Sequence, residues 1–290
     1  DFRLHVATWN VAEGEPPDDV EELLGVKESP LPDMVVIGLQ EITMKPGQAI
    51  INNIFDDKWT RSFDITLSKF GYEKVKTKRM VGIVLNIFVL LEHSNYVRDV
   101  FTEGVPTGWG GLFGNKGAVA ISMDLYGKKM RFVNSHLHAH DGQLAKRIED
   151  YHIIVRELRD TTQPEFSFWL GDLNFRLNEP FLEANTILRR VLREDFESLL
   201  AKDELKAVMR DGSAFATYSE QDIHFRPTYK MIHGMNDYNT KRKPAWTDRI
   251  LYVANPKLSP NKYTSLINYW TSDHRPVIAV FDITLDKPTY

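Results

Sequence analysis

The sequence predicts an α/β fold in which two packed β-sheets are flanked by helices. Two observations support this fold class. Strand-like apolar runs recur along all 290 residues, and three longer segments show helical periodicity. In addition, no linker rich in Gly, Pro or Ser is long enough to separate domains. We therefore expect one domain over residues 1–290.

The predicted strands either alternate between apolar and polar residues or are continuously apolar and β-branched. They are Leu4–Thr8, Met34–Leu39, Ile83–Leu91, Ala118–Leu125, Met130–Ser135, Phe166–Leu170, Ile250–Ala254 and Val277–Ile283. Tyr126-Gly127-Lys128-Lys129 predicts a hairpin turn between two of them. The most apolar window, Val81–Leu91, is too short to span a membrane and predicts a buried strand.

Helical periodicity is found in Ile50–Phe70, Gln143–Arg159 and Pro180–Leu200. In Gln143–Arg159 the apolar residues recur at steps of three and four, and Lys, Arg and Glu fill the positions between them. This pattern is typical of a helix that packs one face against a sheet. The three segments therefore predict the helices that flank the two sheets.

Composition limits the possible functions. The formal net charge is −4, which argues against a sequence-blind DNA binder but permits a locally basic site for a polyanion. The chain has no cysteine, so it has neither disulfides nor thiolate chemistry, and this is compatible with a reducing cytosol. It begins at Asp1 on strand-like sequence. We therefore expect an excised domain whose targeting segments and protein-binding regions lie outside it.

Two dense segments, residues 168–176 and 244–251, place acidic and amide side chains directly beside runs of large apolar residues. In the first, a buried strand ends in Gly-Asp-Leu-Asn. Because side chains alternate along a strand, we expect Asp172 and Asn174 to lie on one face. Stability does not require this arrangement, whereas phosphate chemistry with a hard metal ion does.

Further polar residues also follow or flank predicted strands, namely Asn10, Glu41, Asp273 and the histidines of residues 136–140. Carboxylate and amide oxygens gathered at one sheet edge suit Mg²⁺. Zinc is disfavoured because the chain has no cysteine and the other candidate ligands are hard oxygens. His138 alternates to the other face and is interpreted as an ordinary surface histidine.

Taken together, these segments resemble the signature motifs of the inositol polyphosphate 5-phosphatases, which are phosphoinositide-hydrolysing members of the endonuclease/exonuclease/phosphatase superfamily. The resemblance runs from Thr8-Trp9-Asn10 to Ser272-Asp273-His274, with Thr247 where much of the family has Cys. It implies a four-layer, DNase-like α/β sandwich. It also implies Mg²⁺-dependent removal of the 5-phosphate from phosphatidylinositol 4,5-bisphosphate or 3,4,5-trisphosphate at a cytosolic membrane face, by in-line attack of water.

The resemblance also implies roles for the metal and phosphate ligands. Glu41 would be the principal metal ligand, Asn10 would support the metal or the phosphate, and Asp273 would lie beside the metal. His136 would donate a hydrogen bond to the scissile phosphate as charge develops in the transition state. His140 is expected nearby as a weaker phosphate contact.

For the attacking water, the family pattern implies that Asp172 accepts or aligns its proton and that Asn174 orients it. Asp248 would pair with His274 and favour its protonated form. A rival assignment makes His274 the general base, and the sequence leaves both open. Arg176 either continues the same face of the site or forms a structural salt bridge.

Basic groups predict substrate recognition. Gly114-Asn115-Lys116-Gly117 offers an amide and an ammonium from a glycine-flanked turn. By resemblance, four further residues would hold the neighbouring 4-phosphate: Tyr229, Lys230, Arg242 and Lys243. Each short basic run alone is more often a solvated surface.

The segment 106–114 places large apolar residues, Trp109, Leu112 and Phe113, among glycines. Either these side chains fold back into the body, or the loop dips transiently into a bilayer beside the site, which favours a lipid substrate. Other functional classes remain as alternatives: a nuclease or neutral sphingomyelinase of the same superfamily, or a catalytically inactive module that binds phosphoinositides. A complete catalytic set and the ring-phosphate residues favour the phosphatase, with no nucleic acid as partner.

Overall fold

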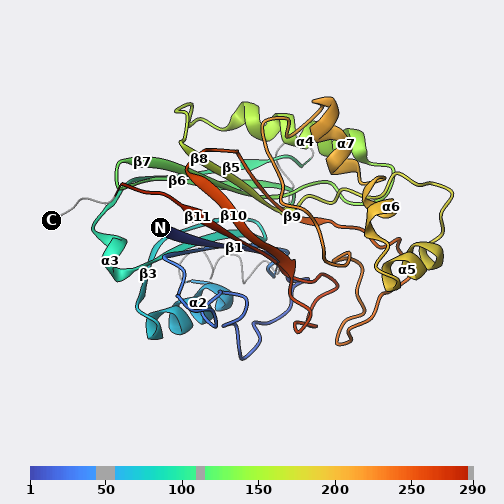
Figure 1. The fold of residues 1–290 in the computed structure, drawn as a ribbon, viewed down its shortest axis with the longest axis horizontal. Helices are drawn as coiled ribbons and strands as arrows, with labels where there is room; N and C mark the ends of the chain where they lie inside the picture. Colours follow the sequence, from blue (N-terminus) through green and yellow to red (C-terminus); the bar gives the residue numbers. More distant parts are fainter. Residues whose placement is uncertain (44–55, 109–114, 287–290) are drawn as a thin grey trace.

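The computed structural model describes residues 1–43, 56–108 and 115–286. Four layers are visible in Figure 1: helices α4 (Leu144–Glu157) and α7 (Glu204–Asp211) cover one sheet, and α2 (Lys58–Lys69) covers the other. This is the four-layer α/β sandwich expected. The three residues proposed to contact a membrane, Trp109, Leu112 and Phe113, lie outside the described residues.

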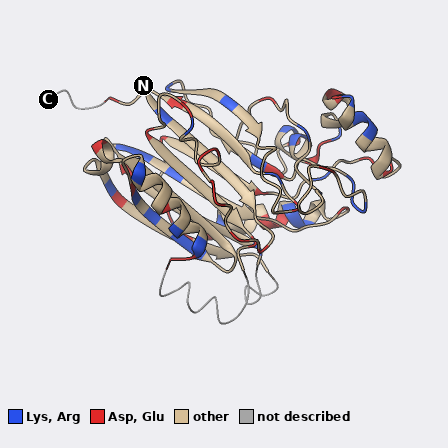
Figure 2. Ribbon diagram, turned by 90° about the horizontal axis from the view of Figure 1, so that it is seen from below, with Lys and Arg blue, Asp and Glu red and all other residues tan. Residues whose placement is uncertain are grey.

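The first sheet is mixed and has the strand order β10-β11-β1-β2-β4-β3. Its strands are β1 (Phe2–Asn10), β2 (Met34–Gln40), β3 (Tyr72–Met80), β4 (Ile83–Leu90), β10 (Leu258–Ser265) and β11 (Val277–Ile283). Only β1 and β2 pair in parallel. Lys and Arg residues, blue on the ribbon of Figure 2, recur along the edge strand β3 and on the neighbouring α2.

The second sheet has the order β5-β6-β7-β8-β9. Its strands are β5 (Val97–Pro106), β6 (Gly117–Leu125), β7 (Lys128–His136), β8 (Phe166–Asp172) and β9 (Asp248–Tyr252), and only β7 and β8 are parallel. Tyr126 and Gly127 both have positive φ, 53° and 78°. This two-residue turn suits the right-handed twist of a hairpin and confirms the predicted turn between β6 and β7.

All eight predicted strands are present, but the helices differ in detail. The helix predicted over Pro180–Leu200 is two helices, α5 (Ala184–Leu192) and α6 (Phe196–Leu200), because Glu194 between them takes a left-handed conformation with φ 57°. The described helix within Ile50–Phe70 begins after Asp57, whose carboxylate accepts a hydrogen bond from the Thr60 amide as an N-cap. The sequence did not predict α3 (Leu91–Ser94), α7 or the strands β3, β5 and β10.

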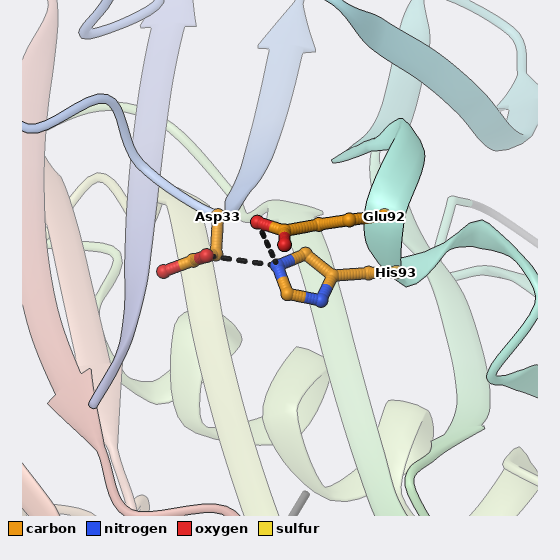
Figure 3. Close-up of side chains that lie close together, drawn as sticks. All are labelled: Asp33, Glu92 and His93. Carbon is orange, nitrogen blue, oxygen red and sulfur yellow. Dashed lines mark hydrogen bonds and ion pairs between the residues drawn. The ribbon is translucent and has the colours of Figure 1, made fainter. Parts of the chain in front are cut away.

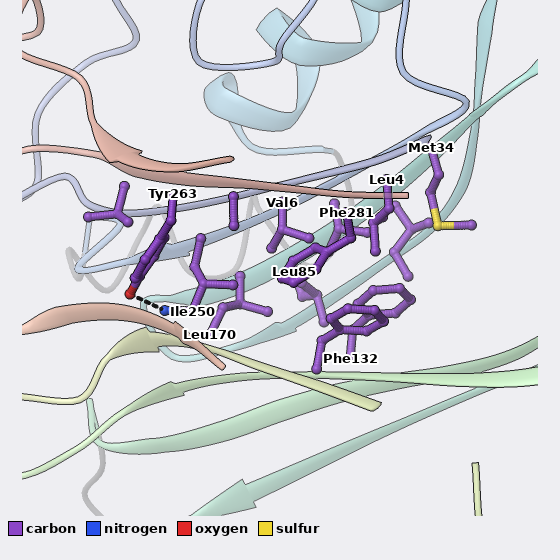
Figure 4. Close-up of a cluster of buried hydrophobic side chains, with 14 of the residues drawn as sticks. Leu4, Val6, Met34, Leu85, Phe132, Leu170, Ile250, Tyr263 and Phe281 are labelled. Carbon is purple, nitrogen blue, oxygen red and sulfur yellow. Dashed lines mark hydrogen bonds between the residues drawn. The ribbon is translucent and has the colours of Figure 1, made fainter. Parts of the chain in front are cut away.

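The main core lies between the two sheets (Figure 4). Leu4, Leu85 and Phe281 from the first sheet face Phe132 and other apolar residues of the second. A buried polar bridge also joins the sheets near one end. Gln40 Nε2 donates to Asn134 Oδ1 at 2.8 Å, and Asn134 Nδ2 donates to backbone carbonyls of the first sheet. None of the described helices combines the length and apolar character needed to cross a membrane.

The parallel pairs β1–β2 and β7–β8 give the fold one polar edge. In each pair both strands finish at the same sheet edge, and the two edges meet, because Asn10 at the end of β1 hydrogen-bonds Asp172 at the end of β8. The carboxyl ends of parallel strands are where ligand sites form in open α/β sheets. Chain topology therefore collects the candidate residues at this edge.

Candidate active site

Three adjacent strands set the catalytic candidates in a row. His136, the last residue of β7, lies opposite Asp172, the last residue of β8, and Asp172 lies opposite Asp248, the first residue of β9. From the other sheet, Asn10 Nδ2 donates to Asp172 Oδ2 at 3.0 Å and to Glu41 Oε2. Residues far apart in the sequence are thus held at one point by strand register.

The residues at this point fit a hard divalent metal ion. Ligand atoms of Glu41, His136 and Asp172 lie within 4.8 Å of one another. Among the described residues no group donates to Asp172 Oδ1, although this oxygen is buried. An enclosed carboxylate oxygen that lacks a donor is costly unless a cation or water meets it. Asp273 is set further out, with its carboxylate 32% exposed.

His136 is enclosed between Asp172 and Lys116. Its Nε2 lies 3.3 Å from Asp172 Oδ2 and 2.9 Å from Lys116 Nζ. Burial lowers the pKa of Lys116 more than the nearby Asp172 and Glu41 carboxylates raise it. The Lys116 ammonium therefore lies directly in the cluster, whereas Asn115 beside it is exposed.

Asp248 and His274 are paired, as the resemblance implied. His274 Nδ1 lies 2.8 Å from Asp248 Oδ2, and two hydroxyls donate to the same oxygen: Thr228 Oγ1 at 2.6 Å and Thr247 Oγ1 at 2.9 Å. Sequence reasoning missed Thr228 and noted Thr247 only as a departure from the family pattern. The position of Thr228 in Pro227-Thr228-Tyr229-Lys230, directly before two selected residues, could have indicated a role in the site.

Electrostatics assign different charge states to His274 and Asp172. Burial by itself lowers the pKa of His274, but the Asp248 and Asp172 carboxylates outweigh it and raise the pKa to about 10. Burial raises the pKa of Asp172, yet the charges of His274, His136 and Lys116 lower it well below its usual range. At neutral pH the site thus holds an imidazolium whose Nε2 is 3.7 Å from an ionised carboxylate oxygen.

The expected alternation of Asp172 and Asn174 is wrong. β8 ends at Asp172, and Asn174 has a left-handed backbone with φ 59°. Its amide Nδ2 donates to the Leu137 carbonyl at 2.9 Å, and its Oδ1 accepts from Arg176 Nη2 at 2.9 Å. Alternation holds only while the chain is extended. Strand periodicity therefore places neither Asn174 nor Arg176 at the site.

Arg176 nevertheless lies beside the catalytic pair by another route. Its guanidinium carbon is 4.9 Å from the centre of the Tyr229 ring, and that ring is 4.7 Å from the His274 ring. His140 is exposed, and its pKa is lowered by desolvation and then by the charges of Arg242, Arg176 and Lys116. The exposed His140 and Arg242 define the rim of the site, and the charges of the buried Arg176 and the partly buried Lys116 also act on His140.

Two of the predicted phosphate ligands are less directly placed. Lys243 Nζ donates to the carbonyl of Glu179 at 3.0 Å, so its ammonium is tied to the segment before α5. Lys230 is partly buried, and its carbonyl accepts from the Asn239 amide. The charge of Arg242 therefore acts on His140 at the rim, whereas the ammonium of Lys243 is hydrogen-bonded to the Glu179 carbonyl.

Comparison with known proteins gives a consistent family. The model of the endonuclease/exonuclease/phosphatase family 2 matches residues 7–280. Phosphatidylinositol 4,5-bisphosphate 5-phosphatase A of Rattus norvegicus is 34% identical over 97% of this chain. The chain spans 31% of the length of that relative.

Two solved structures resemble the chain over nearly its whole length. The inositol polyphosphate 5-phosphatase domain of spSynaptojanin, in complex with inositol (1,4)-bisphosphate and calcium ion, is 30% identical with a TM-score of 0.86, covering 97% of this chain and 84% of that one. The Cimex nitrophorin ferrous NO complex is 26% identical with a TM-score of 0.80, covering 98% and 99%. The same architecture thus occurs in proteins with different ligands.

Proposed function

Since the chain belongs to the endonuclease/exonuclease/phosphatase family, we propose that residues 1–290 form one catalytic domain that hydrolyses the 5-phosphate of phosphoinositides with Mg²⁺. The substrates would be phosphatidylinositol 4,5-bisphosphate, the 3,4,5-trisphosphate, or both. One observation carries the proposal: Asp172 lies in contact with Asn10, His136 and the Asp248–His274 pair at the meeting edge of the two sheets. The names of the relatives supply the substrate class.

Metal binding would fall to Glu41 and Asp172, held together by the Asn10 amide, with Asp273 further out. A bound Mg²⁺ would neutralise negative charge on the phosphoryl oxygens. His136 would donate a hydrogen bond to the phosphate where negative charge develops. Lys116, in contact with His136, would add a positive charge to the same region.

We assign alignment of the attacking water to Asp172 rather than to His274. With a pKa raised to about 10, His274 is already protonated at neutral pH and has no free nitrogen to accept a proton. Asp172 is ionised and retains an oxygen that no described residue donates to. His274, oriented by Asp248, would then contribute charge and a hydrogen bond. Asn174 would orient water only if its amide left the Leu137 carbonyl.

Recognition of the neighbouring 4-phosphate would rest on Tyr229, Lys230, Arg242 and Lys243, with Arg176 and His140 on the same rim. A phosphate at this rim would meet cations from several segments, which favours bidentate contacts from arginine. Trp109, Leu112 and Phe113 would contact the bilayer transiently, which would place the enzyme peripherally at a cytosolic membrane face. Protein partners would bind regions outside these 290 residues.

The proposal is tested by phosphate release, with Mg²⁺ and with EDTA, from phosphatidylinositol 4,5-bisphosphate, its 3,4,5-trisphosphate, inositol 1,4,5-trisphosphate and a DNA duplex. We expect metal-dependent loss of the 5-phosphate from inositides and no cleavage of DNA. Product analysis identifies the phosphate removed. Cleaved DNA with intact inositides would instead make the protein a nuclease, and binding of inositides without release would make it an inactive module.

A second candidate is binding of NO at a ferrous centre, because the Cimex nitrophorin ferrous NO complex resembles this chain over 98% of its length. The observation that favours the phosphatase is the assembled set of carboxylates and imidazoles described above. Absorption spectroscopy of the purified protein, with NO added under reducing conditions, separates the two. We expect no spectral change that saturates with NO.

A further inference from the structure

A second cluster of potential metal ligands lies at the end of the sandwich opposite the catalytic edge (Figure 3). It contains Asp33, which directly precedes β2, and Glu92 and His93 of α3. His93 Nε2 lies 2.8 Å from Asp33 Oδ1 and 3.6 Å from Glu92 Oε1. All three ligand atoms are within 4.8 Å of one another.

The chemistry around His93 is unusual because two carboxylates converge on one ring nitrogen. The imidazole is fully buried, and its other nitrogen, Nδ1, is 2.6 Å from the hydroxyl of Tyr126. Nε2 carries at most one proton, and it can donate that proton to Asp33 Oδ1 at 2.8 Å. The Glu92 carboxylate oxygen, at 3.6 Å from Nε2, is too far away for a hydrogen bond. A divalent cation in place of that proton would satisfy the nitrogen and both carboxylates together.

We propose that Asp33, Glu92 and His93 form a site for a divalent metal ion, distinct from the catalytic metal site, and we take zinc as its probe. One imidazole nitrogen and two carboxylate oxygens leave a fourth, open position of the tetrahedral arrangement that zinc prefers. When Nε2 binds the ion, the remaining proton moves to Nδ1 and is donated to the Tyr126 hydroxyl. This is the outer-shell contact that orients metal-binding histidines.

The position of the cluster suggests what the ion would do. Asp33 and His93 flank strands of the first sheet, and Tyr126 belongs to the β6–β7 turn of the second. Asp33 is further fixed because its Oδ2 accepts from the Arg3 amide at 2.7 Å. Glu92 is 67% exposed, so the third ligand can reach solvent and an entering ion. A bound ion would therefore hold Asp33 to α3 at the end remote from Asp172, next to the hydrogen bond between His93 and Tyr126 of the second sheet.

The test is zinc binding by titration calorimetry in buffer saturated with Mg²⁺, comparing the intact chain with Glu92→Gln and Glu41→Gln. The two substitutions make the same chemical change, one in this cluster and one at the catalytic edge. We expect Glu92→Gln to remove one class of zinc site that Glu41→Gln retains, and Tyr126→Phe to weaken it by about tenfold. Crystals soaked in zinc should show anomalous density between Asp33 and His93.

Catalysis serves as a second readout. Glu92 is remote from the catalytic edge, so Glu92→Gln should release phosphate with Mg²⁺ at the rate of the unaltered chain. If zinc binding is unchanged in Glu92→Gln and the anomalous density is only at Glu41 and Asp172, the proposal is overturned. The cluster would then be a hydrogen-bonded Tyr–His–Asp network, and the phosphatase proposal would be unaffected.

Discussion

Strand β9 contributes to two buried charge clusters of opposite character. Asp248 belongs to the catalytic edge, and the next residue, Arg249, points to the other face, where its guanidinium meets Asp203 and Glu220. All five N–H groups of Arg249 are donated: to the two carboxylates and to the Trp246 carbonyl. Lys206 Nζ, 3.8 Å from Glu220 Oε1, supplies a second positive charge. This second cluster is closed, because two cations match its two carboxylates and every N–H group of Arg249 is donated.

The catalytic cluster is open by comparison. Within the described part of the chain, Asp172 Oδ1, Asp248 Oδ1 and His136 Nδ1 are buried and have no hydrogen-bond partner. Closed networks of this kind fix a fold, whereas enclosed atoms without partners require a ligand, ion or water. The contrast teaches that burial of charge does not by itself identify a functional site. Unmatched buried atoms distinguish the two clusters.

The largest expected effect comes from disrupting the catalytic cluster, and it is a loss of turnover. Asp172→Ala should lower phosphate release by at least about a thousandfold, because it removes the group that aligns the attacking water and a metal ligand. The fold should persist, since the unmatched oxygen is lost with the residue. Steady-state kinetics measure the loss, and thermal unfolding is the control. Turnover within tenfold of the unaltered chain would show that Asp172 does not have this role.

Breaking the closed cluster should instead unfold the protein. Arg249→Met leaves the buried Asp203 without its counter-ion and leaves Glu220 with only Lys206, whose Nζ is 3.8 Å from Glu220 Oε1, among the described residues. We expect a loss of about 3–5 kcal/mol in the free energy of unfolding. Urea denaturation measures it. Arg249→Lys is the matched control, because it keeps the charge but not the forked geometry, and it should be intermediate. If Arg249→Met lowers the free energy of unfolding by less than about 1 kcal/mol, this cluster does not stabilise the fold.

Two buried histidines extend the comparison to pH. Burial lowers the pKa of His5 to about 4, since its ring has only the Leu23 carbonyl as a partner, whereas the pKa of His274 is raised by carboxylates. Between pH 6.5 and 4 the unfolded chain binds a proton at His5 and the folded chain does not. Stability is therefore lost as the pH falls through this window, by about 3 kcal/mol in total.

We expect His5→Gln to remove this part of the pH dependence, because glutamine does not titrate. Its free energy of unfolding, measured in urea at pH 7 and pH 4, should fall by about 3 kcal/mol less than that of the unaltered chain. The contribution of His274 to the free energy of unfolding depends on pH in the opposite sense. It is fully present below pH 6.5 and is lost as the pH rises through about 10. Parallel profiles for the variant and the unaltered chain would contradict the assignment for His5.

Among the described strands, the sequence predicted all except those at three of the four sheet edges. The three strands it missed, β3, β5 and β10, are all edge strands. An edge strand has one neighbour and an exposed side, so selection against aggregation favours charge and irregularity over apolar runs. β3 is rich in lysine, and β10 contains Pro260 at a register shift. The central strands, buried on both faces, gave clear apolar signals.

The site was predictable where it depends on strand ends and not where it depends on turns. Asn10, His136 and Asp172 end strands and Asp248 begins one, and their meeting follows from register. Asn174 departed from prediction because a left-handed residue ends the alternation after β8. Such backbone conformations depend on tertiary contacts, here the Leu137 carbonyl, which no local pattern encodes.

The smallest expected effect concerns substrate choice at the basic rim. Removing Arg242 and Lys243 together should weaken hydrolysis of 4-phosphorylated lipids by roughly tenfold or more and spare a lipid that carries only a 5-phosphate. The single variants sharpen this, since Lys243 is bonded to the Glu179 carbonyl while Arg242 lowers the pKa of His140 at the rim. Arg242→Ala should therefore account for most of the selective loss in kcat/KM. Equal losses on both lipids would show that these residues do not contact the 4-phosphate.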